Sequence, residues 1–121
     1  MAATEREYPR PKSSVLKWSI QQAGRWVRSA ANLGTVQIAF VDHALTRSSE
    51  RAISQDEAVA CICEGHASRW EQHDRSDGSS MHLTLSLESR IEVIEVVVAL
   101  SDEDPDLWVI TMWTRKPKSG R

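Results

Sequence analysis

The segment MHLTLSLESRIEVIEVVVAL, residues 81–100, decides the fold. Its first eight residues alternate, with leucines on one face and histidine, threonine and serine on the other. A period of two residues is typical of a β-strand with one buried face. Glu88, Ser89 and Arg90 then turn the chain into a second apolar run. We predict two antiparallel strands, the first with an apolar face of Leu83, Leu85 and Leu87 and a polar face of His82, Thr84 and Ser86.

Two further segments complete the predicted sheet. ASRWEQHD, residues 67–74, leads into the turn RSDGSS, which carries the Asp-Gly signal of a tight hairpin. LWVITMWT, residues 107–114, follows the polar loop SDEDPD. This order predicts an antiparallel meander of about four strands. In the last strand we expect Trp108, Ile110 and Met112 to face one way and Val109, Thr111 and Trp113 the other.

The residues before the sheet have helical patterns. Ser13 or Ser14 can cap a helix that runs to about Asn32, and Gly34 stands where such a helix ends. Apolar residues recur at intervals of three and four and form one stripe. A separate basic face could bind phosphates or an anionic membrane surface, or could simply be exposed to solvent. The apolar stripe is Leu16, Ile20, Ala23, Val27 and Ala30, and the basic face is Lys17, Arg25 and Arg28 with Trp18.

A further helix is predicted within ISQDEAVACICEG, residues 53–65. Ser54 and Glu57 have the spacing of a capping box, and Gly65 marks the end of the helix. The two thiols would lie about 200° apart around the helix axis, so they cannot readily bind one metal ion. We predict no metal site and no cofactor. We expect a buried stripe of Val59, Ile62 and Cys63, with Cys61 at the side or the surface.

These patterns predict an α+β protein in which N-terminal helices pack on a four-stranded antiparallel sheet. A short β-prone segment, TVQIAF, separates the helical parts. The opening residues hold two prolines and show no periodicity, so we expect them to be flexible. We divide the chain into a flexible arm (1–12), a basic amphipathic helix extension (13–34), a domain of helix and antiparallel sheet (35–116) and a basic tail (117–121).

Charge is unevenly distributed, although the net charge is only −2. Residues 1–51 carry eight basic and four acidic side chains, whereas residues 52–114 carry three basic and thirteen acidic ones. This balance argues against non-specific coating of nucleic acid and leaves room for a local basic face. An ordinary solvated surface with no ligand could have the same uneven distribution of charge.

Several classes of protein are disfavoured by missing patterns. The sequence contains no G-x-x-x-x-G-K-[ST], no G-x-G-x-x-G and no G-x-S-x-G motif. Its apolar runs are far shorter than the roughly 20 residues of a membrane span. Cys61 and Cys63 are too few and too close for a disulfide framework. We therefore expect a cytoplasmic protein without a membrane span.

The stretch DHALTRSSERAIS, residues 42–54, carries the strongest functional signal. His43, Arg47 and Arg51 follow one another at intervals of four. In a helix they fall within about 80° on one face, where like charges repel unless an anion lies between them. A phosphate would bind such a ridge. Alternatively, the arginines pair with nearby carboxylates and hold the helix to the sheet.

HALTRSSERAISQDEAVACICEG and the later WVITMWTRKP resemble a family of small bacterial domains. Its pattern is H-A-x-x-R-x-x-x-R-x-I, a short helix ending in glycine, and a terminal strand V-x-T-x-Y-R. The resemblance spans about residues 40–116. This family is similar to the barnase, EndoU, colicin and RelE-like group of RNA-cleaving toxins, which have N-terminal helices and a four-stranded antiparallel sheet. Trp113 stands at the usual tyrosine, so an indole that can stack on a base replaces an ionisable hydroxyl.

The resemblance implies a toxin-like ribonuclease that cleaves RNA without a metal, through attack of a 2′-hydroxyl on phosphate. His43 would act as general acid or base near neutral pH. Arg47 and Arg51 would bind the non-bridging oxygens. Thr111 would orient the phosphate or the histidine.

Substrate binding would fall to Trp113, His82 and Arg115. His82 is also the candidate for a second proton-transfer group. The implied partners are RNA and a cognate antitoxin or immunity protein, and the protein would act in the cytoplasm of its own cell or of a target cell.

Two other functions fit the same residues. A non-catalytic interaction module could use the basic ridge to bind an acidic protein or nucleic acid. A RelE- or ParE-like toxin could instead poison a protein target such as a topoisomerase. The sequence leaves open whether the protein is an enzyme, and it does not indicate an RNA target, a base preference or an oligomeric state.

Overall fold

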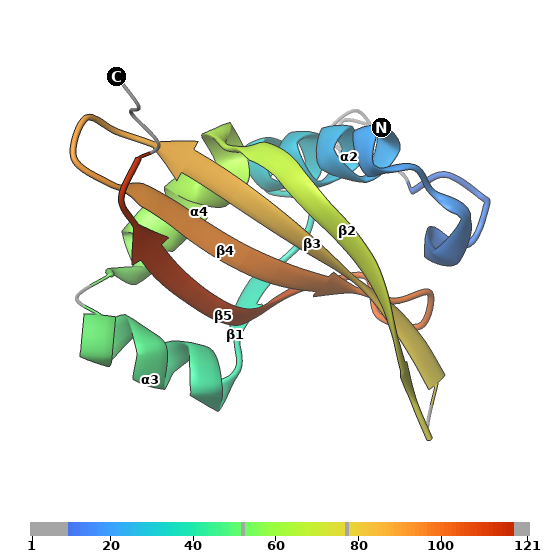
Figure 1. Ribbon diagram of the computed structural model, residues 1–121. Coiled ribbons are helices and arrows are strands. Elements are labelled where there is room, and N and C mark those ends of the chain that lie inside the picture. The colour runs from blue at the N-terminus through green and yellow to red at the C-terminus, as the bar shows by residue number, and fades with distance from the viewer. Residues whose placement is uncertain (1–9, 52, 77, 118–121) are drawn as a thin grey trace.

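A computed structural model describes residues 10–51, 53–76 and 78–117. Figure 1 shows helices packed around one twisted sheet, which confirms the α+β class. The helices are η1 (Val15–Lys17), α2 (Ile20–Leu33), α3 (Asp42–Arg51) and α4 (Gln55–Glu64). The strands are β1 (Ile38–Phe40), β2 (His66–Arg75), β3 (Gly78–Glu88), β4 (Val93–Leu100) and β5 (Leu107–Arg115).

The sheet differs from the predicted meander at one edge. Its five strands lie in the order β1-β5-β4-β3-β2. The strands β2 to β5 pair antiparallel, as expected. However, β1 pairs with β5 in parallel, with Ile38 opposite Leu107 and Phe40 opposite Val109. The expectation of four strands, all antiparallel, was therefore wrong. The segment TVQIAF was β-prone as noted, but a local pattern cannot reveal that its last three residues pair with the far end of the chain.

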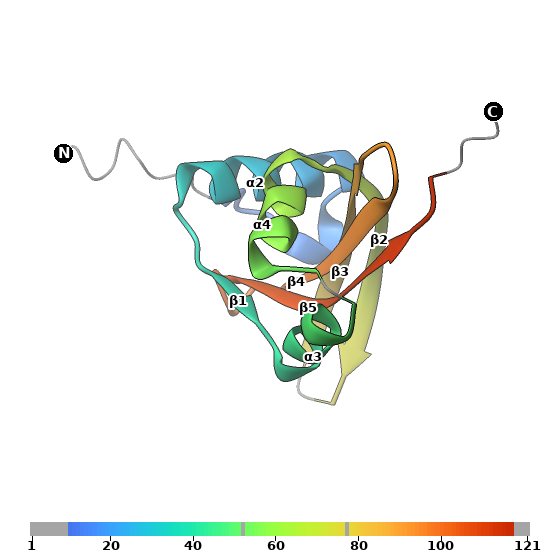
Figure 2. The same ribbon diagram turned by 90° about the vertical axis from the view of Figure 1, so that its left-hand side faces the viewer.

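Helices α2 and α4 cover one face of the sheet, while α3 lies beside β5 (Figures 1 and 2). In Figure 2, β5 runs between α4 and α3. The hydrophobic core fills the space between the sheet and α2 and α4. Its fully buried members include Leu83, Leu85, Val96, Val98 and Met112 from the sheet, with Val27 and Ile62 from the helices. We call the opposite face of the sheet, which α2 and α4 leave uncovered, the open face, although five of its side chains are buried: Thr84, Ser86, Val93, Glu95 and Val97.

Helix α2 begins later than predicted. Ser19 caps it by accepting a hydrogen bond from the backbone N–H of Gln22, whereas Ser14 caps the short η1 instead. The predicted end is confirmed, because Gly34 adopts a left-handed conformation with φ 70°. A residue with a Cβ is strained at such a φ, which is why glycine suits this position.

Two residues ahead of α2 were wrongly assigned to helical faces. Trp18, expected beside the basic residues, is buried, and its ring centroid lies 5.7 Å from that of Trp26. Leu16, expected in the apolar stripe, is exposed. Both precede the helix, so its period of 3.6 residues does not govern where their side chains point. The arginines of the basic face, Arg25 and Arg28, are exposed as expected.

The predicted ends of α4 are confirmed, but its thiols are reversed. Ser54 and Glu57 form the complete capping box, and Gly65 caps the C-terminus. Cys61, expected at the side or surface, is fully buried, whereas Cys63 is half-buried. The buried face consists of Ala58, Cys61 and Ile62, at the spacing of three and four that defines one helical stripe. Burial raises the pKa of the Cys61 thiol to about 12.

A β-bulge in β5 changes the alternation predicted for that strand. Val97 lies opposite Thr111, but the next residue, Val98, lies opposite Val109, so Ile110 is an extra residue. Val109 and Met112 therefore both point into the core. Trp108 is instead on the open face with Thr111 and Trp113. The predicted grouping was wrong because a bulge shifts the period of two by one residue.

The N-terminal segment packs against the loop between β4 and β5. The hydroxyl of Ser14 donates to Asp102, and the Val15 N–H donates to the same carboxylate at 2.8 Å. Arg10 lies 5.0 Å from the Trp26 ring centroid. Residues 1–9 of the predicted arm and 118–121 of the predicted tail lie outside the described residues. Within the described part of the chain, no helix is long and apolar enough to cross a membrane.

Candidate functional site

Four rows of side chains cross the open face from β3 through β4 to β5. The first row lies at the end where β5 begins, and the fourth at the end where β5 finishes. In order, the rows are His82–Ala99–Trp108, Thr84–Val97–Thr111, Ser86–Glu95–Trp113 and Glu88–Val93–Arg115. The polar face predicted for β3 is thereby confirmed.

The four site residues predicted in the sheet share this face but divide into two groups. Thr111, Trp113 and Arg115 follow one another at alternate positions of β5. His82 lies in the first row, two strands away from β5. Six residues along a strand separate the first row from the fourth, which is about 20 Å at roughly 3.3 Å per residue. His82 and Arg115 therefore cannot contact the same phosphate group.

The predicted ridge of α3 forms in part. The Nε of Arg47 donates to Nε2 of His43 at 3.3 Å, and its Nη1 forms an ion pair with Glu50 at 3.0 Å. Arg47 lies about 60° around the helix axis from the fully buried Ala44. Helix α3 contacts β5, the strand that carries Thr111, while His43 itself is exposed and Arg47 is half-buried. Arg51 is exposed at the end of the helix.

A polar cluster occupies the third and fourth rows. The hydroxyl of Ser86 donates to Oε2 of Glu95 at 2.9 Å, and the Nε of Arg115 donates to the same oxygen at 3.0 Å. The Glu95 side chain is only 12 % exposed and that of Arg115 is 40 % exposed. A carboxylate in this position needs its hydrogen-bonding partners, because an unpaired buried charge is strongly unfavourable.

Sequence reasoning missed Glu95 as a site residue. The available signal was a charged residue inside the apolar run IEVIEVVVAL, at a position that alternation places on the polar face. Its partner Arg115 lies twenty residues further along the chain. Only the pairing of β4 with β5 brings the two together, with Trp113 directly opposite Glu95.

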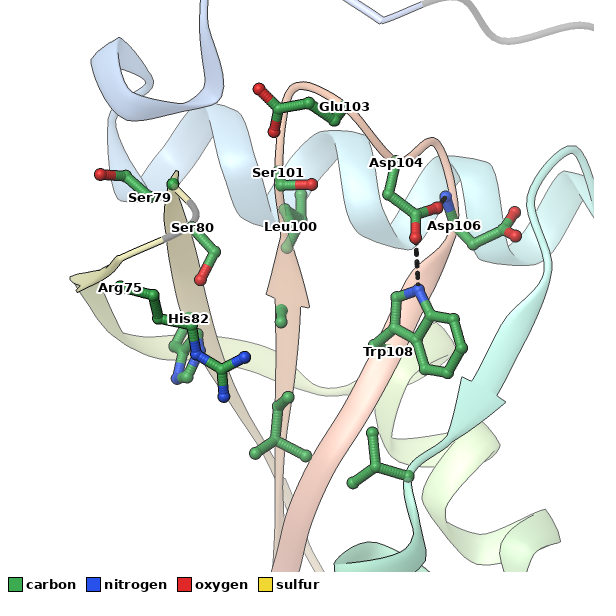
Figure 3. Close-up of a pocket in the computed structure, with 14 residues that line it drawn as sticks. Arg75, Ser79, Ser80, His82, Leu100, Ser101, Glu103, Asp104, Asp106 and Trp108 are labelled. Carbon is green, nitrogen blue, oxygen red and sulfur yellow. Dashed lines mark hydrogen bonds between the residues drawn. The ribbon is translucent and has the colours of Figure 1, made fainter.

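A pocket of about 430 Å³ opens at the first-row end of the face. Figure 3 shows His82 and Arg75 on one side of it and Trp108 on the other, with the β4–β5 loop above. The indole N–H of Trp108 donates to Asp104 at 2.7 Å. The loop also contributes Glu103 and Asp106, so the rim is acidic.

His82 is unsuited to the proton-transfer role considered for it. Burial lowers its pKa to about 4, and the nearby His73 and Arg75 act in the same direction. The imidazole is therefore neutral at pH 7 and would be a poor general acid there. Its ring stacks on that of His73, with 3.8 Å between the centroids. These contacts suit it to stacking and hydrogen bonding.

Among the described residues, no three or more histidine, cysteine or acidic side chains form a group that could hold a metal ion. The candidate site and the neighbouring pocket are built from imidazoles, arginines, hydroxyls, carboxylates and two indoles.

Comparison with known proteins identifies one family. The family described as Domain of unknown function (DUF4258) matches residues 40–114, a range that runs from the end of β1 to β5 and so includes α3 and the open face up to, but not including, Arg115. No significant match is found among curated proteins or solved structures. The matched range exceeds half of the chain, and the protein therefore belongs to the DUF4258 family.

Proposed function

We propose that the protein is a metal-independent ribonuclease whose site lies along β5, between the ridge of α3 and the open face. The observation that carries the proposal is the place of the His43–Arg47 pair on a helix that contacts β5. That strand presents Thr111, Trp113 and Arg115 at successive alternate positions. An imidazole, fixed cations and an indole are the groups that RNA cleavage uses for proton transfer, charge stabilisation and base stacking.

His43 is the proposed proton-transfer group. Its Nε2 accepts a hydrogen bond from Arg47. An imidazole nitrogen has a single lone pair, so Arg47 must release this bond before His43 can act as a general base. It would take the proton of a 2′-hydroxyl while O2′ forms a bond to the neighbouring phosphorus. The bond from phosphorus to the 5′-oxygen then breaks, and the imidazolium returns the proton to that oxygen. The products are a 2′,3′-cyclic phosphate and a 5′-hydroxyl.

Arginines would stabilise the charge that builds up on the phosphorus oxygens. Arg47 is held beside His43, and Arg115 is held at its Nε by Glu95. The terminal nitrogens of a guanidinium fixed in this way can still donate to phosphate oxygens. We assign Glu95 to positioning Arg115, because its carboxylate already accepts from both Ser86 and Arg115.

Binding of RNA without cleavage is the second candidate, and one observation favours it. Arg47 is paired with Glu50, and Arg115 with Glu95, each at 3.0 Å. Two of the predicted cations therefore already have carboxylate partners, which reduces the positive potential available to a reacting phosphate.

The test is incubation of end-labelled RNA with the purified protein in excess chelator, beside an all-deoxy oligonucleotide of the same sequence. We expect the RNA to be cut with 2′,3′-cyclic phosphate ends and the DNA to stay intact. His43→Ala should lower the rate about 100-fold or more. Arg28→Ala, which removes an exposed arginine from α2 behind the sheet, is the matched control and should cleave normally.

The alternatives give different results in the same experiment. Folded protein that binds the RNA but leaves it intact would support the second candidate against the first. Folded protein that neither binds nor cleaves RNA would overturn both. A toxin role additionally predicts that expression arrests growth, that His43→Ala relieves the arrest, and that a cognate neutralising protein protects the cell.

A further inference from the structure

The pocket at the first-row end has His82 and Arg75 on one side and Trp108 on the other, and we call the space between them the slot (Figure 3). His82, Ala99 and Trp108 lie directly opposite one another on adjacent strands. Neighbouring strands are about 4.8 Å apart, so the backbones of the outer two residues are separated by roughly 10 Å. A planar ring that touches a group on each side needs about 7–8 Å. The methyl side chain of Ala99 leaves this space unfilled, as the cavity there confirms.

Trp108 forms a fixed wall of the slot. It is 38 % exposed, which is unusual for a residue so large and apolar. Its indole N–H is nevertheless tied to Asp104 at 2.7 Å. Asp104 is itself held, because its carboxylate accepts from the Asp106 N–H at 2.9 Å and its carbonyl accepts from Arg10 at 3.0 Å. The ring is thus ordered before any ligand arrives, which lowers the entropic cost of binding.

The charges around the slot select against an anion. Glu103, Asp104 and Asp106 line its upper rim. Two arginines oppose these three carboxylates: Arg75 on the opposite side, and Arg10, which donates to the carbonyl of Asp104 at 3.0 Å. His82 is neutral at pH 7, as argued above. A negative rim beside an indole favours a flat ligand whose edge carries N–H donors, since carboxylates accept hydrogen bonds from amino groups of bases.

We propose that this pocket binds an amino-bearing nucleobase, stacked on Trp108 with its amino edge toward the acidic rim. If the occupant is a base of bound RNA, the inference rests on the proposed ribonuclease function, and the pocket would determine which base the ribonuclease prefers. Ala99 lies four residues from Glu95 along β4, about 13 Å at roughly 3.3 Å per residue. A nucleotide near the reacting phosphate could therefore place its base in the pocket.

Cytidine and uridine form the matched probe pair, because they differ at C4, where cytidine has an amino group and uridine a carbonyl. We would titrate each, and adenosine, into the protein and follow the indole N–H resonance of Trp108 by NMR, assigned by its loss in Trp108→Phe. We expect adenosine and cytidine to shift it and uridine to bind at least about fivefold more weakly.

Two variants test the slot itself. Ala99→Leu fills it and Trp108→Leu removes the stacking surface, so each should weaken cytidine binding about tenfold or more. Trp108→Phe keeps an aromatic ring and should retain most of the binding. Circular dichroism and thermal unfolding would establish that each variant is folded. Equal binding of uridine and cytidine, or cytidine binding that Ala99→Leu leaves intact, would overturn the inference, as would folded protein that binds no nucleoside.

RNA cleavage provides a second, independent test of the pocket. If the wild type cleaves RNA, Ala99→Leu should lower kcat/KM about tenfold and weaken any preference for amino-bearing bases. Nucleoside binding that the variants abolish, with RNA cleavage unchanged, would support the nucleobase pocket and assign it to a free nucleoside or base. Failure of cleavage in the wild type would overturn the ribonuclease proposal alone, because nucleoside binding is measured without catalysis.

Discussion

Arg115 and Glu95 are joined across β4 and β5 by a hydrogen bond of 3.0 Å from Nε to Oε2, on the face of the sheet that α2 and α4 leave uncovered. The pair ties the C-terminal end of β5 to the centre of the sheet. Because the carboxylate is mostly buried, the arginine beside it matters for stability as well as for any contact with phosphate.

The two members of the pair should contribute unequally to the free energy of unfolding. Arg115→Ala leaves the Glu95 carboxylate with Ser86 as its remaining side-chain donor, so we expect a loss of about 1–3 kcal/mol in the free energy of unfolding. Glu95→Gln keeps an acceptor oxygen and should cost less. Urea denaturation of both single variants and the double variant would give the coupling energy. Additive effects of the two changes would show that the pair contributes nothing.

His82 should titrate far below an ordinary histidine. Burial lowers its pKa to about 4, so between pH 6.5 and 4 the unfolded chain binds a proton that the folded protein does not. Stability should therefore fall as pH decreases through this range. NMR titration of the imidazole C–H resonances would locate the midpoint, and His73→Ala should raise it by removing a nearby positive charge. A midpoint near 6.5 would contradict the buried, stacked arrangement.

Asp102 should make the packing of the N-terminal segment sensitive to acid. Hydrogen bonds from the Ser14 hydroxyl and the Val15 N–H hold the pKa of this carboxyl below its usual 3.8. Its contribution to stability is therefore complete above pH 3.8 and is lost as the pH falls through the lower folded-state value. Asp102→Asn should flatten this part of the pH profile of thermal unfolding. An unchanged profile between pH 2 and 5 would refute the linkage.

Gly65 should not tolerate even a methyl group. A Cβ at this position would lie 2.5 Å from the carbonyl oxygen of Cys61 and 2.6 Å from that of Ser86. Both are backbone atoms, so neither can rotate away, and we expect Gly65→Ala to cost about 3 kcal/mol. Gly34→Ala is the comparison, because nothing lies near its Cβ and the cost there is backbone strain of about 1 kcal/mol. In thermal unfolding, the Tm of the Gly65→Ala variant should be well below that of the Gly34→Ala variant.

Local patterns were sufficient for much of the secondary structure. The alternation of Leu83 and Leu85, the Ser54–Glu57 capping box and the stop at Gly34 each depend on residues within a few positions of one another. For the site, the four-residue spacing on α3 correctly anticipated that His43 and Arg47 would lie together.

The errors have separate physical causes. Trp18 was misplaced because the helix begins after it, Cys61 because the buried stripe of α4 is Ala58, Cys61 and Ile62 and not the one predicted, and the residues of β5 because of one irregular residue. Because of the bulge at Ile110, the residues of β5 before it point to the faces opposite to those predicted: Val109 points into the core and Trp108 to the open face. No local sequence pattern predicts this bulge.

By itself, the sequence determined the helices, the long strands and the polar face of β3, because hydrogen bonding and side-chain periodicity act over a few residues. Only the tertiary structure decided that β1 pairs with β5, that Arg115 meets Glu95, and that Trp108 faces His82 across Ala99. Those relationships depend on the order and register of the strands, which are set when the whole hydrophobic core is packed at once.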